Sequence, residues 1–353
     1  MKLSRLLFLA SLALAALAAL EHALERRSES ARRAGVRVER LVDPAQKEGV
    51  TVAAVTLGIP GRPELVYARS RGEWRCMSAF GAPVAIGQLQ GLLASFLEAR
   101  GVVRARSNAA AATYGLAETA TLVRFHGPKI LTAEDRDVLF AFEVGASVAG
   151  GALGRAFVRA LDSGAILEID HDPTRFLAWP EGQAFPPLLD ERLLAGAWPR
   201  GVQGFERIFV DFESGASLEL ARRPAPDAGA EGGLGEWVAR DGTREVVALP
   251  YRLAGFLNFL ARATFTGLAD PRDAAGLGHD PPFARVTIVP TGAEPLELTV
   301  GNAIDAEGTV FVANGASGAL VQTSAESARL LAPTLTMMVD TNIPNPWEVW
   351  LSR

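Results

Sequence analysis

The second half of the chain shows the clearest alternation of apolar and polar positions. β-Strands are predicted where apolar residues alternate or cluster in short runs, over 205–212, 216–221, 284–289, 296–300, 309–313 and 319–323. Residues 250–263 instead place Leu253, Phe256, Leu257 and Leu260 at helical spacing, which predicts an amphipathic helix. A shorter helix is predicted over 324–332, with Ser324 as its N-cap.

The first half follows the same order of elements. A helix is predicted over 86–100, and strands are predicted over 120–125, 138–144, 154–161 and 165–169. Strands grouped around one or two helices, without strict strand–helix alternation, indicate an α+β fold with mainly antiparallel sheets.

Short signatures recur in the two halves. Gly72-Glu73-Trp74 reappears as Gly235-Glu236-Trp237, and the same spacing of 163 residues separates Phe96-Leu97 from Phe259-Leu260. Three further matches follow at slightly shorter spacings: "TYGL" from Thr113 with "AAGL" from Ala274, "FEVG" ending at Gly145 with "LTVG" ending at Gly301, and "FVRALDSGA" from Phe157 with "FVANGASGA" from Phe311. Because the matches keep their order, they predict a duplicated domain with deletions in the second copy.

The chain is therefore divided into four parts. Residues 1–24 form a signal anchor or signal peptide, and 25–34 form a charged stalk. An α+β repeat follows over 35–200, and a second repeat with an aromatic C-terminal tail follows over 201–353. We expect Trp74 and Trp237 to be large core residues on equivalent strands, and Gly115 and Gly276 to form turns with positive φ.

The ordered signatures resemble those of a bacterial family catalogued as domain of unknown function 4340. In the first repeat the matching residues are Trp74, Tyr114, Gly115, Leu116, Val144, Gly145, Phe157 and Val158. In the second they are Trp237, Gly276, Leu277, Val300, Gly301, Phe311 and Val312, with Ala275 where the first repeat has Tyr114. The resemblance implies a membrane-anchored protein that lies beside ABC-transport components of the gliding-motility type. It supplies no catalytic residues.

The N-terminus indicates the cellular address. Lys2 and Arg5 precede an apolar run over 6–20, which is typical of a signal peptide or signal anchor. We expect this run to bind the inner membrane and the body to face the periplasm. Five arginines after the run favour the opposite, cytoplasmic orientation by the positive-inside rule.

Charge limits the choice of partners. The formal net charge is -5, and the part of the chain after the stalk is also net acidic, which argues against a nucleic-acid partner. The single cysteine, Cys76, lies two residues after Trp74 and is expected in the core.

Candidate chemistry is sparse. Asp170, His171 and Asp172 are all metal-ligand types, but consecutive residues point in alternate directions, and Asp172-Pro173 favours a helix start. The acidic stretch over 132–137 is interpreted as a turn. His126 and His279 are placed in loops, and no cofactor is predicted.

Function is therefore predicted to lie in protein docking by a non-enzymatic envelope protein, as an accessory or scaffold of a membrane complex. Unpaired sheet edges suit strand addition. Pro344 and Pro346 are expected to prevent regular structure in the tail, where Trp347 and Trp350 are the candidate docking anchors, with packing on the second repeat as the alternative. The other hypothesis is a metal-dependent hydrolase or small-ligand-binding protein that uses Asp170, His171 and Asp172.

Overall fold

A computed structural model describes residues 37–70, 72–130, 136–147, 154–183, 185–194, 204–223, 236–242, 244–315 and 318–352. The apolar run, the stalk, most of the acidic stretch over 132–137 and most of the loop before Trp237 lie outside these residues. Two compact units are present: Met1–Val50 with Ala94–Leu122 and Phe140–Thr174, and Thr51–Leu93 with Val123–Leu139 and Arg175–Arg353. Within the described residues, no helix has the length and apolar character needed to cross a membrane.

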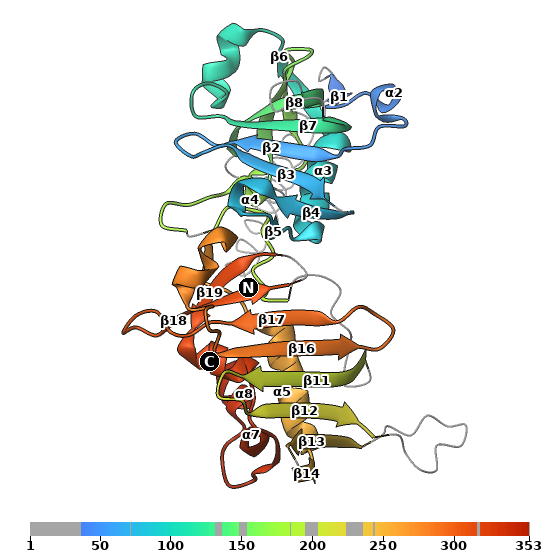
Figure 1. Cartoon of the computed structure of the whole chain (residues 1–353). Helices are drawn as coiled ribbons and strands as arrows, with labels where there is room; N and C mark the ends of the chain where they lie inside the picture. The colour runs from blue at the N-terminus through green and yellow to red at the C-terminus, as the bar shows by residue number, and fades with distance from the viewer. Residues whose placement is uncertain are drawn as a thin grey trace, which may run out of the picture. The chain divides into compact units, whose positions relative to one another are not determined.

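Two antiparallel sheets with several helices make the fold α+β, as the sequence predicts (Figure 1). The first sheet contains β1(Val38–Arg40), β2(Ala54–Gly58), β3(Leu65–Ser70), β4(Glu73–Cys76), β5(Ala82–Pro83), β6(Arg100–Ala105), β7(Thr121–Ile130), β8(Arg136–Ser147), β9(Ala156–Ala160) and β10(Ile166–Ile169). The second contains β11(Phe205–Phe212), β12(Ser217–Arg222), β13(Trp237–Asp241), β14(Arg244–Val247), β15(Gly267–Ala269), β16(Ala284–Pro290), β17(Leu296–Val300), β18(Thr309–Asn314) and β19(Leu320–Ser324).

The strand orders of the two sheets correspond. The first runs β1-β6-β10-β9-β8-β7-β2-β3-β4-β5, and the second, read from its β15 edge, runs β15-β19-β18-β17-β16-β11-β12-β13-β14. Each strand from β2 to β10 thus has its counterpart nine places later in the chain, at the same position in the other sheet.

The registers of the strands correspond as well. Val144 lies opposite Val158 in the first sheet, and Val300 lies opposite Val312 in the second. Trp74 lies opposite Arg69 on β3, and Trp237 lies opposite Arg222 on β12. A one-residue slip would move each side chain to the other face, so agreement in register is stricter than agreement in order.

Even β1 has a partial counterpart. Arg40 pairs with Arg100, and Arg192 forms an isolated bridge with Thr264. The residue that follows each of these pairs also forms a matching backbone hydrogen bond. The Leu41 N–H donates to the Ala99 carbonyl (3.0 Å), and the Leu193 N–H donates to the Ala263 carbonyl (2.8 Å). The segment around 190–194 therefore matches the segment around 38–42.

One amphipathic helix packs on each sheet. These are α3(Ile86–Leu97) and α5(Pro250–Arg262), and the shorter helices are α2(Pro44–Lys47), α4(Thr174–Leu177), α6(Ala325–Leu331), α7(Leu335–Val339) and α8(Pro346–Leu351). The buried positions of the two helices agree best when Leu89 is matched with Leu253 and Phe96 with Leu260. The predicted match of Phe96 with Phe259 is therefore wrong by one residue. Ser324 does cap α6, since its side chain accepts from the Ser327 N–H.

The predicted turn glycine is correct in the first half and wrong in the second. Gly115 ends the 3-10 helix η2(Asn108–Tyr114) with φ 67°, but the residue that ends η4(Pro271–Leu277) with φ 83° is Gly278, not Gly276. Tyr114 therefore corresponds to Leu277 rather than to Ala275. Gly115 and Gly278 are separated by the same 163 residues as the two tryptophans.

The second half also carries an insertion that the sequence matches did not reveal. Arg69 and Arg222 are 153 residues apart, whereas their cross-strand partners Trp74 and Trp237 are 163 apart. Ten extra residues therefore lie in the Pro-, Gly- and Ala-rich loop before Trp237. Deletions alone do not explain the changing spacing.

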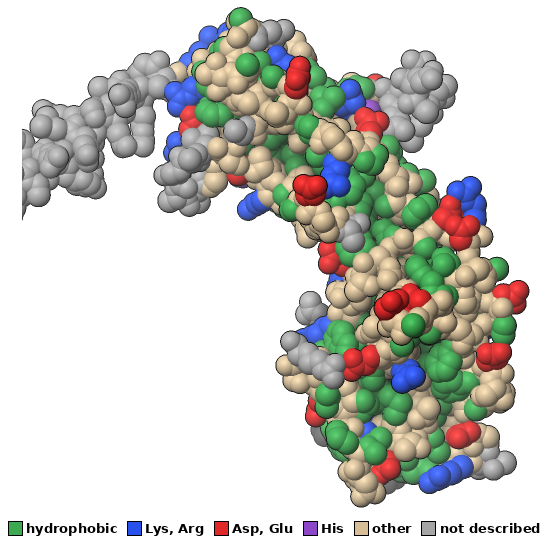
Figure 2. Space-filling view, turned by 90° about the vertical axis from the view of Figure 1, so that its left-hand side faces the viewer, with side chains coloured by type: hydrophobic (Ala, Val, Ile, Leu, Met, Phe, Trp, Pro, Cys, Tyr) green, Lys and Arg blue, Asp and Glu red, His purple; other side chains and the backbone are tan. Residues whose placement is uncertain are grey.

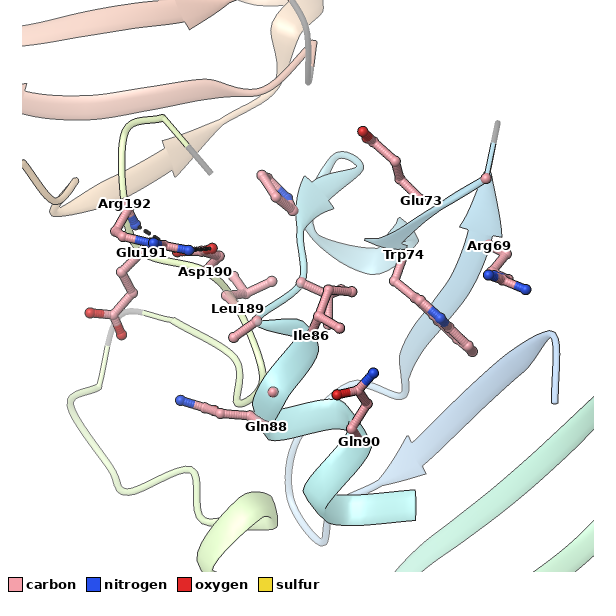
Figure 3. A pocket seen from close by; sticks show the side chains of 15 residues that line it. Arg69, Glu73, Trp74, Ile86, Gln88, Gln90, Leu189, Asp190, Glu191 and Arg192 are labelled. Atoms are coloured by element: carbon pink, nitrogen blue, oxygen red, sulfur yellow. Dashed lines mark hydrogen bonds and ion pairs between the residues drawn. The ribbon is translucent and has the colours of Figure 1, made fainter. Parts of the chain in front are cut away.

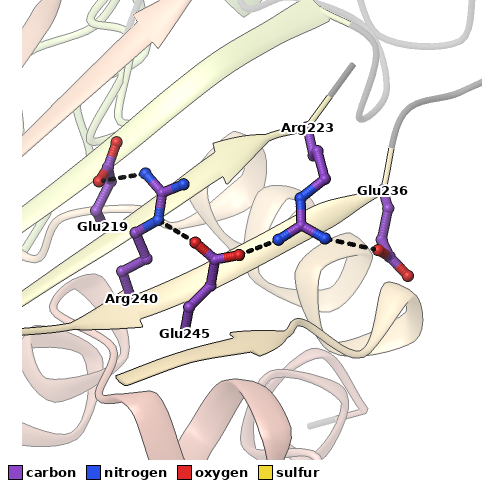
Figure 4. A network of polar contacts seen from close by, with 5 residues as sticks. All are labelled: Glu219, Arg223, Glu236, Arg240 and Glu245. Atoms are coloured by element: carbon purple, nitrogen blue, oxygen red, sulfur yellow. Dashed lines mark hydrogen bonds and ion pairs between the residues drawn. The ribbon is translucent and has the colours of Figure 1, made fainter. Parts of the chain in front are cut away.

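The sheet edges are short and partly charged. The four edge strands, β1, β5, β14 and β15, contain three, two, four and three residues. Across β12, β13 and β14, a chain of ion pairs joins Glu219, Arg240, Glu245, Arg223 and Glu236 (Figure 4). Short edges with charged side chains disfavour pairing with another strand, so these edges suit strand addition poorly. The face in Figure 2 likewise shows acidic and basic side chains in small mixed groups.

Gly145 and Gly301 form equivalent close contacts, which gives a matched pair of substitutions. A Cβ at Gly145 would lie 2.3 Å from the Tyr114 carbonyl oxygen, whereas one at Gly301 would lie 3.0 Å from the carbonyl oxygens of Leu277 and Phe311. We expect Gly145→Ala to lower the free energy of unfolding by about 3 kcal/mol and Gly301→Ala by about 1 kcal/mol. Urea unfolding followed by circular dichroism measures both, and equal losses would contradict the geometry.

Candidate functional site

The segment Asp170–Asp172 does not form a site. The Asp170 carboxylate accepts from the Arg100 N–H (3.2 Å) and lies 2.9 Å from the His171 Nδ1. The Asp172 carboxylate instead accepts from the Thr174 N–H (2.9 Å) and from the Ser147 hydroxyl (3.0 Å). The two carboxylates therefore bond to different groups. Asp172 accepts a hydrogen bond from the first N–H of α4, as its position before Pro173 predicts. No group of three His, Cys, Asp or Glu side chains in the described part of the chain could hold a metal ion.

The C-terminal tail packs on the second sheet. Trp347 is fully buried, its Nε1 donates to the Leu330 carbonyl (3.2 Å), and its ring centroid lies 5.4 Å from that of Phe256. Trp350 is half-buried and meets Phe259 edge-on at 4.8 Å. The self-packing alternative therefore describes the tail, and Trp347 cannot serve as an exposed docking anchor.

The tail is also helical, contrary to expectation. Pro346 occupies the first turn of α8, where a missing backbone N–H breaks no hydrogen bond. Prolines predicted to prevent regular structure instead start a helix. His126 differs too, because it lies buried on β7 rather than in a loop, with its Nε2 3.1 Å from the Thr56 hydroxyl.

An open cavity of about 880 Å³ lies beside Trp74 (Figure 3). All of its lining residues belong to the second compact unit. β3 and β4 supply one wall, the first turn of α3 supplies the base, and residues 189–192 supply the opposite wall. The side chains of the lining include those of Arg69, Glu73, Trp74, Ile86, Gln88, Gln90, Asp190 and Arg192.

The wall formed by residues 189–192 is attached to the first sheet by backbone hydrogen bonds. The Asp190 N–H donates to the Pro83 carbonyl (3.0 Å), and the Ala85 N–H donates to the Leu188 carbonyl (2.8 Å). Tyr67 on β3 adds a bond from its hydroxyl to the Pro187 carbonyl (2.6 Å). These contacts fix residues 187–190 against β5, across the cavity from Trp74.

Two of the three carboxylates that line the pocket form ion pairs. Glu73 forms an ion pair with Arg75 (2.7 Å), and Asp190 forms one with Arg192 (2.5 Å). In contrast, the side chains of Arg69, Gln88 and Gln90 have no hydrogen-bond partner among the described residues. The pocket therefore offers unused donors and acceptors beside an aromatic ring.

Trp74 differs from its counterpart. Trp237 is 7% exposed, as expected of a core residue, but Trp74 is half-buried and faces the cavity. The prediction that both tryptophans belong to the core is thus correct only for Trp237. Sequence patterns did not single out Arg69, Gln88 or Gln90. The sequence feature that could have indicated this site is the pair of glutamines at 88 and 90, in the first turn of the helix that comes after the strand with Trp74.

The cysteine on the strand that carries Trp74 is poorly suited to nucleophilic chemistry. Cys76 is fully buried, and burial raises the pKa of its thiol to about 11. The thiol is therefore neutral and weakly nucleophilic at physiological pH. A tryptophan face with free guanidinium and amide groups instead suits the binding of a partly apolar ligand.

Comparison with known proteins identifies no relative, since no family model, no curated protein and no solved structure matches the chain.

The buried cross-strand pair of Tyr67 and Cys76 predicts a loss of stability at alkaline pH. Burial, reinforced by Cys76, raises the pKa of Tyr67, and burial raises that of Cys76 from 9.0 to about 11. Both groups hold their protons longer in the folded chain, so stability is intact below pH 9 and falls as pH rises towards 11. We expect Cys76 alone to account for a loss of about 2 kcal/mol by urea unfolding. Cys76→Ala should reduce the dependence of the free energy of unfolding on pH. An unchanged dependence in this variant would contradict the role given to the Cys76 thiol.

The Asp170–Asp172 segment gives a second matched pair. Asp172→Ala removes the acceptor for the Thr174 N–H and should lower the free energy of unfolding by about 1 kcal/mol. His171→Ala removes only an exposed pair and should cost less than about 0.5 kcal/mol. Thermal unfolding of the two variants measures this difference. A larger loss for His171→Ala, or metal that copurifies in stoichiometric amounts and is lost in that variant, would favour a metal site.

Proposed function

We propose that the two halves are tandem copies of one α+β module. The shared strand order, the matched registers and the equivalent glycine contacts support this proposal. The pairing of Arg192 with Thr264 favours a start of the second copy near residue 190, earlier than the predicted 201. The ordered signatures also support a distant relationship to the domain of unknown function 4340 family.

The chain is proposed to be tethered to the inner membrane through residues 6–20, with the body in the periplasm. The basic residues before the apolar run and the length of the run support this address. A tether confines the body near other membrane proteins and raises its effective concentration for them.

Within that setting the protein acts as a non-enzymatic accessory or scaffold of a membrane assembly, of the ABC-transport or gliding-motility type that the resemblance implies. The observation that carries this proposal is the open pocket at Trp74, where Glu73 and Asp190 form ion pairs while Arg69, Gln88 and Gln90 have no hydrogen-bond partner among the described residues. We therefore propose Trp74, rather than the buried Trp347, as the residue that contacts a partner.

A small-ligand-binding protein is the second candidate, because a cavity of about 880 Å³ is large enough for a small molecule. The hydrolase hypothesis receives no support from Asp170, His171 and Asp172, whose carboxylates serve separate partners.

Site-specific photocrosslinking tests the scaffold role. A benzophenone amino acid in place of Gln90 should crosslink the full-length chain in native membranes to one discrete polypeptide, and Trp74→Ala should abolish the product. The matched control replaces Asn258, an exposed residue of α5 in the second copy, and should give no such product. Equal crosslinking from both positions, or crosslinking that survives Trp74→Ala, would contradict docking at the pocket.

The address is tested separately by fusing alkaline phosphatase after Arg353. Because this enzyme is active only after export, we expect active fusions in the membrane fraction. Deletion of residues 1–24 should remove the activity and release the body into the cytoplasm. Inactive full-length fusions would show that the arginines after the apolar run set the orientation.

A further inference from the structure

The second module shows a helix over the strand that begins with its tryptophan. In the second module α7 packs against β13, the strand that begins with Trp237, and both α7 and α8 pack against α5. In the first module, residues 178–183 and 185–194, which follow α4, contain no helix, and Trp74 faces the cavity.

The anchoring of α7 can be followed residue by residue. The Leu249 N–H donates to the Met338 carbonyl (3.1 Å), at the position where the Ala85 N–H donates to Leu188 in the first module. Three residues later stands Arg252, which is 1% exposed and donates to the carbonyls of Met337 (2.9 Å) and Ile343 (2.5 Å). A buried guanidinium thus binds one backbone carbonyl within α7 and one in the segment that follows it.

The equivalent of Arg252 in the first module is Gln88, three residues after Ala85. Its amide is exposed, has no partner among the described residues, and lines the cavity together with Trp74 and Arg69. The first module therefore presents the same aromatic residue and a comparable set of donors for backbone carbonyls, beside residues 187–188, whose Leu188 carbonyl takes the place of the Met338 carbonyl.

We propose that the Trp74 pocket binds a short, uncharged helical segment of a partner protein, which lies beside residues 187–190 and covers Trp74. This inference deepens the proposed docking function and rests on it. α7 has the sequence Leu-Thr-Met-Met-Val, and Met338 is fully buried beneath it. An apolar residue of the partner contacts Trp74, and the carbonyls at the end of its helix accept from Gln88 and Arg69.

Charge favours such an occupant over an anion. The lining contains Glu73, Asp190 and Glu191 against Arg69 and Arg192, so its formal charge is not positive. With two of the acids already paired, a neutral backbone satisfies the free donors without a net electrostatic penalty. Helix-in-groove recognition needs only a few apolar anchors on one face.

The experiment uses the full-length chain in detergent micelles and a fluorescein-labelled peptide of residues 332–344, which contains α7. Fluorescence anisotropy should show saturable binding. Trp74→Ala should weaken it at least about tenfold, as loss of an aromatic hot spot does, and Gln88→Ala about threefold. A peptide with aspartate at 337 and 338 should not bind.

Trp179→Ala is the matched control, because Trp179 is also half-buried but lies outside the pocket, with the Arg62 guanidinium 4.9 Å from its ring centroid. It should leave the affinity unchanged. Gln88 is exposed, so its variant remains informative if Trp74→Ala fails to fold.

Several results would overturn the proposal: no saturable binding up to about 1 mM peptide, equal affinity of all variants, or equal binding of the aspartate peptide. A dimeric chain that the peptide converts to monomer would assign the pocket to a second copy instead of a different protein. Failure of the peptide to bind leaves the crosslinking and export results standing, so the two proposals fail separately.

Discussion

One helix must cover one face of a wide sheet in each module, and it is too narrow to do so. A helix with its side chains is about 10 Å across, whereas neighbouring strands lie about 4.8 Å apart, so one helix covers roughly two strands. The remaining apolar surface has to be buried by connecting segments and by the residues that follow the last strand. The rest of each module depends on how those segments meet this constraint.

The two modules meet it differently after their last strands. In the second, α6, α7 and α8 follow directly, and Trp347 fills the space over Gly255, where an added Cβ would lie 3.4 Å from the Trp347 Cβ. In the first, Phe176 of α4 packs over Gly91, the matching glycine, and Leu188 and Asp190 then form backbone hydrogen bonds with Ala85 and Pro83. This path leaves part of the first turn of α3 and Trp74 exposed beside the pocket.

Much of the fold could be predicted because periodicity reports which side chains share a face. The strands, α3, α5 and the Ser324 cap follow from local pattern. The residue-by-residue match between the two halves could not be predicted from sequence identity, which placed Phe259 and Gly276 one or two residues away from the true counterparts. Burial and φ values identify Leu260 and Gly278 as those counterparts. The exposure of Trp74 was also out of reach, since it depends on what the distant residues 185–192 leave uncovered. Trp237 has the same local sequence and is buried.

The Gly-Glu-Trp signature stands in two different environments. Arg252 can be buried because its guanidinium donates to the carbonyls of Met337 and Ile343, since an unpaired buried guanidinium would be strongly unfavourable. The first module carries Gln88 at that position, which is neutral and exposed. An exposed amide carries no desolvation penalty when the site is empty, and the proposed docking uses the amide of Gln88 together with Trp74.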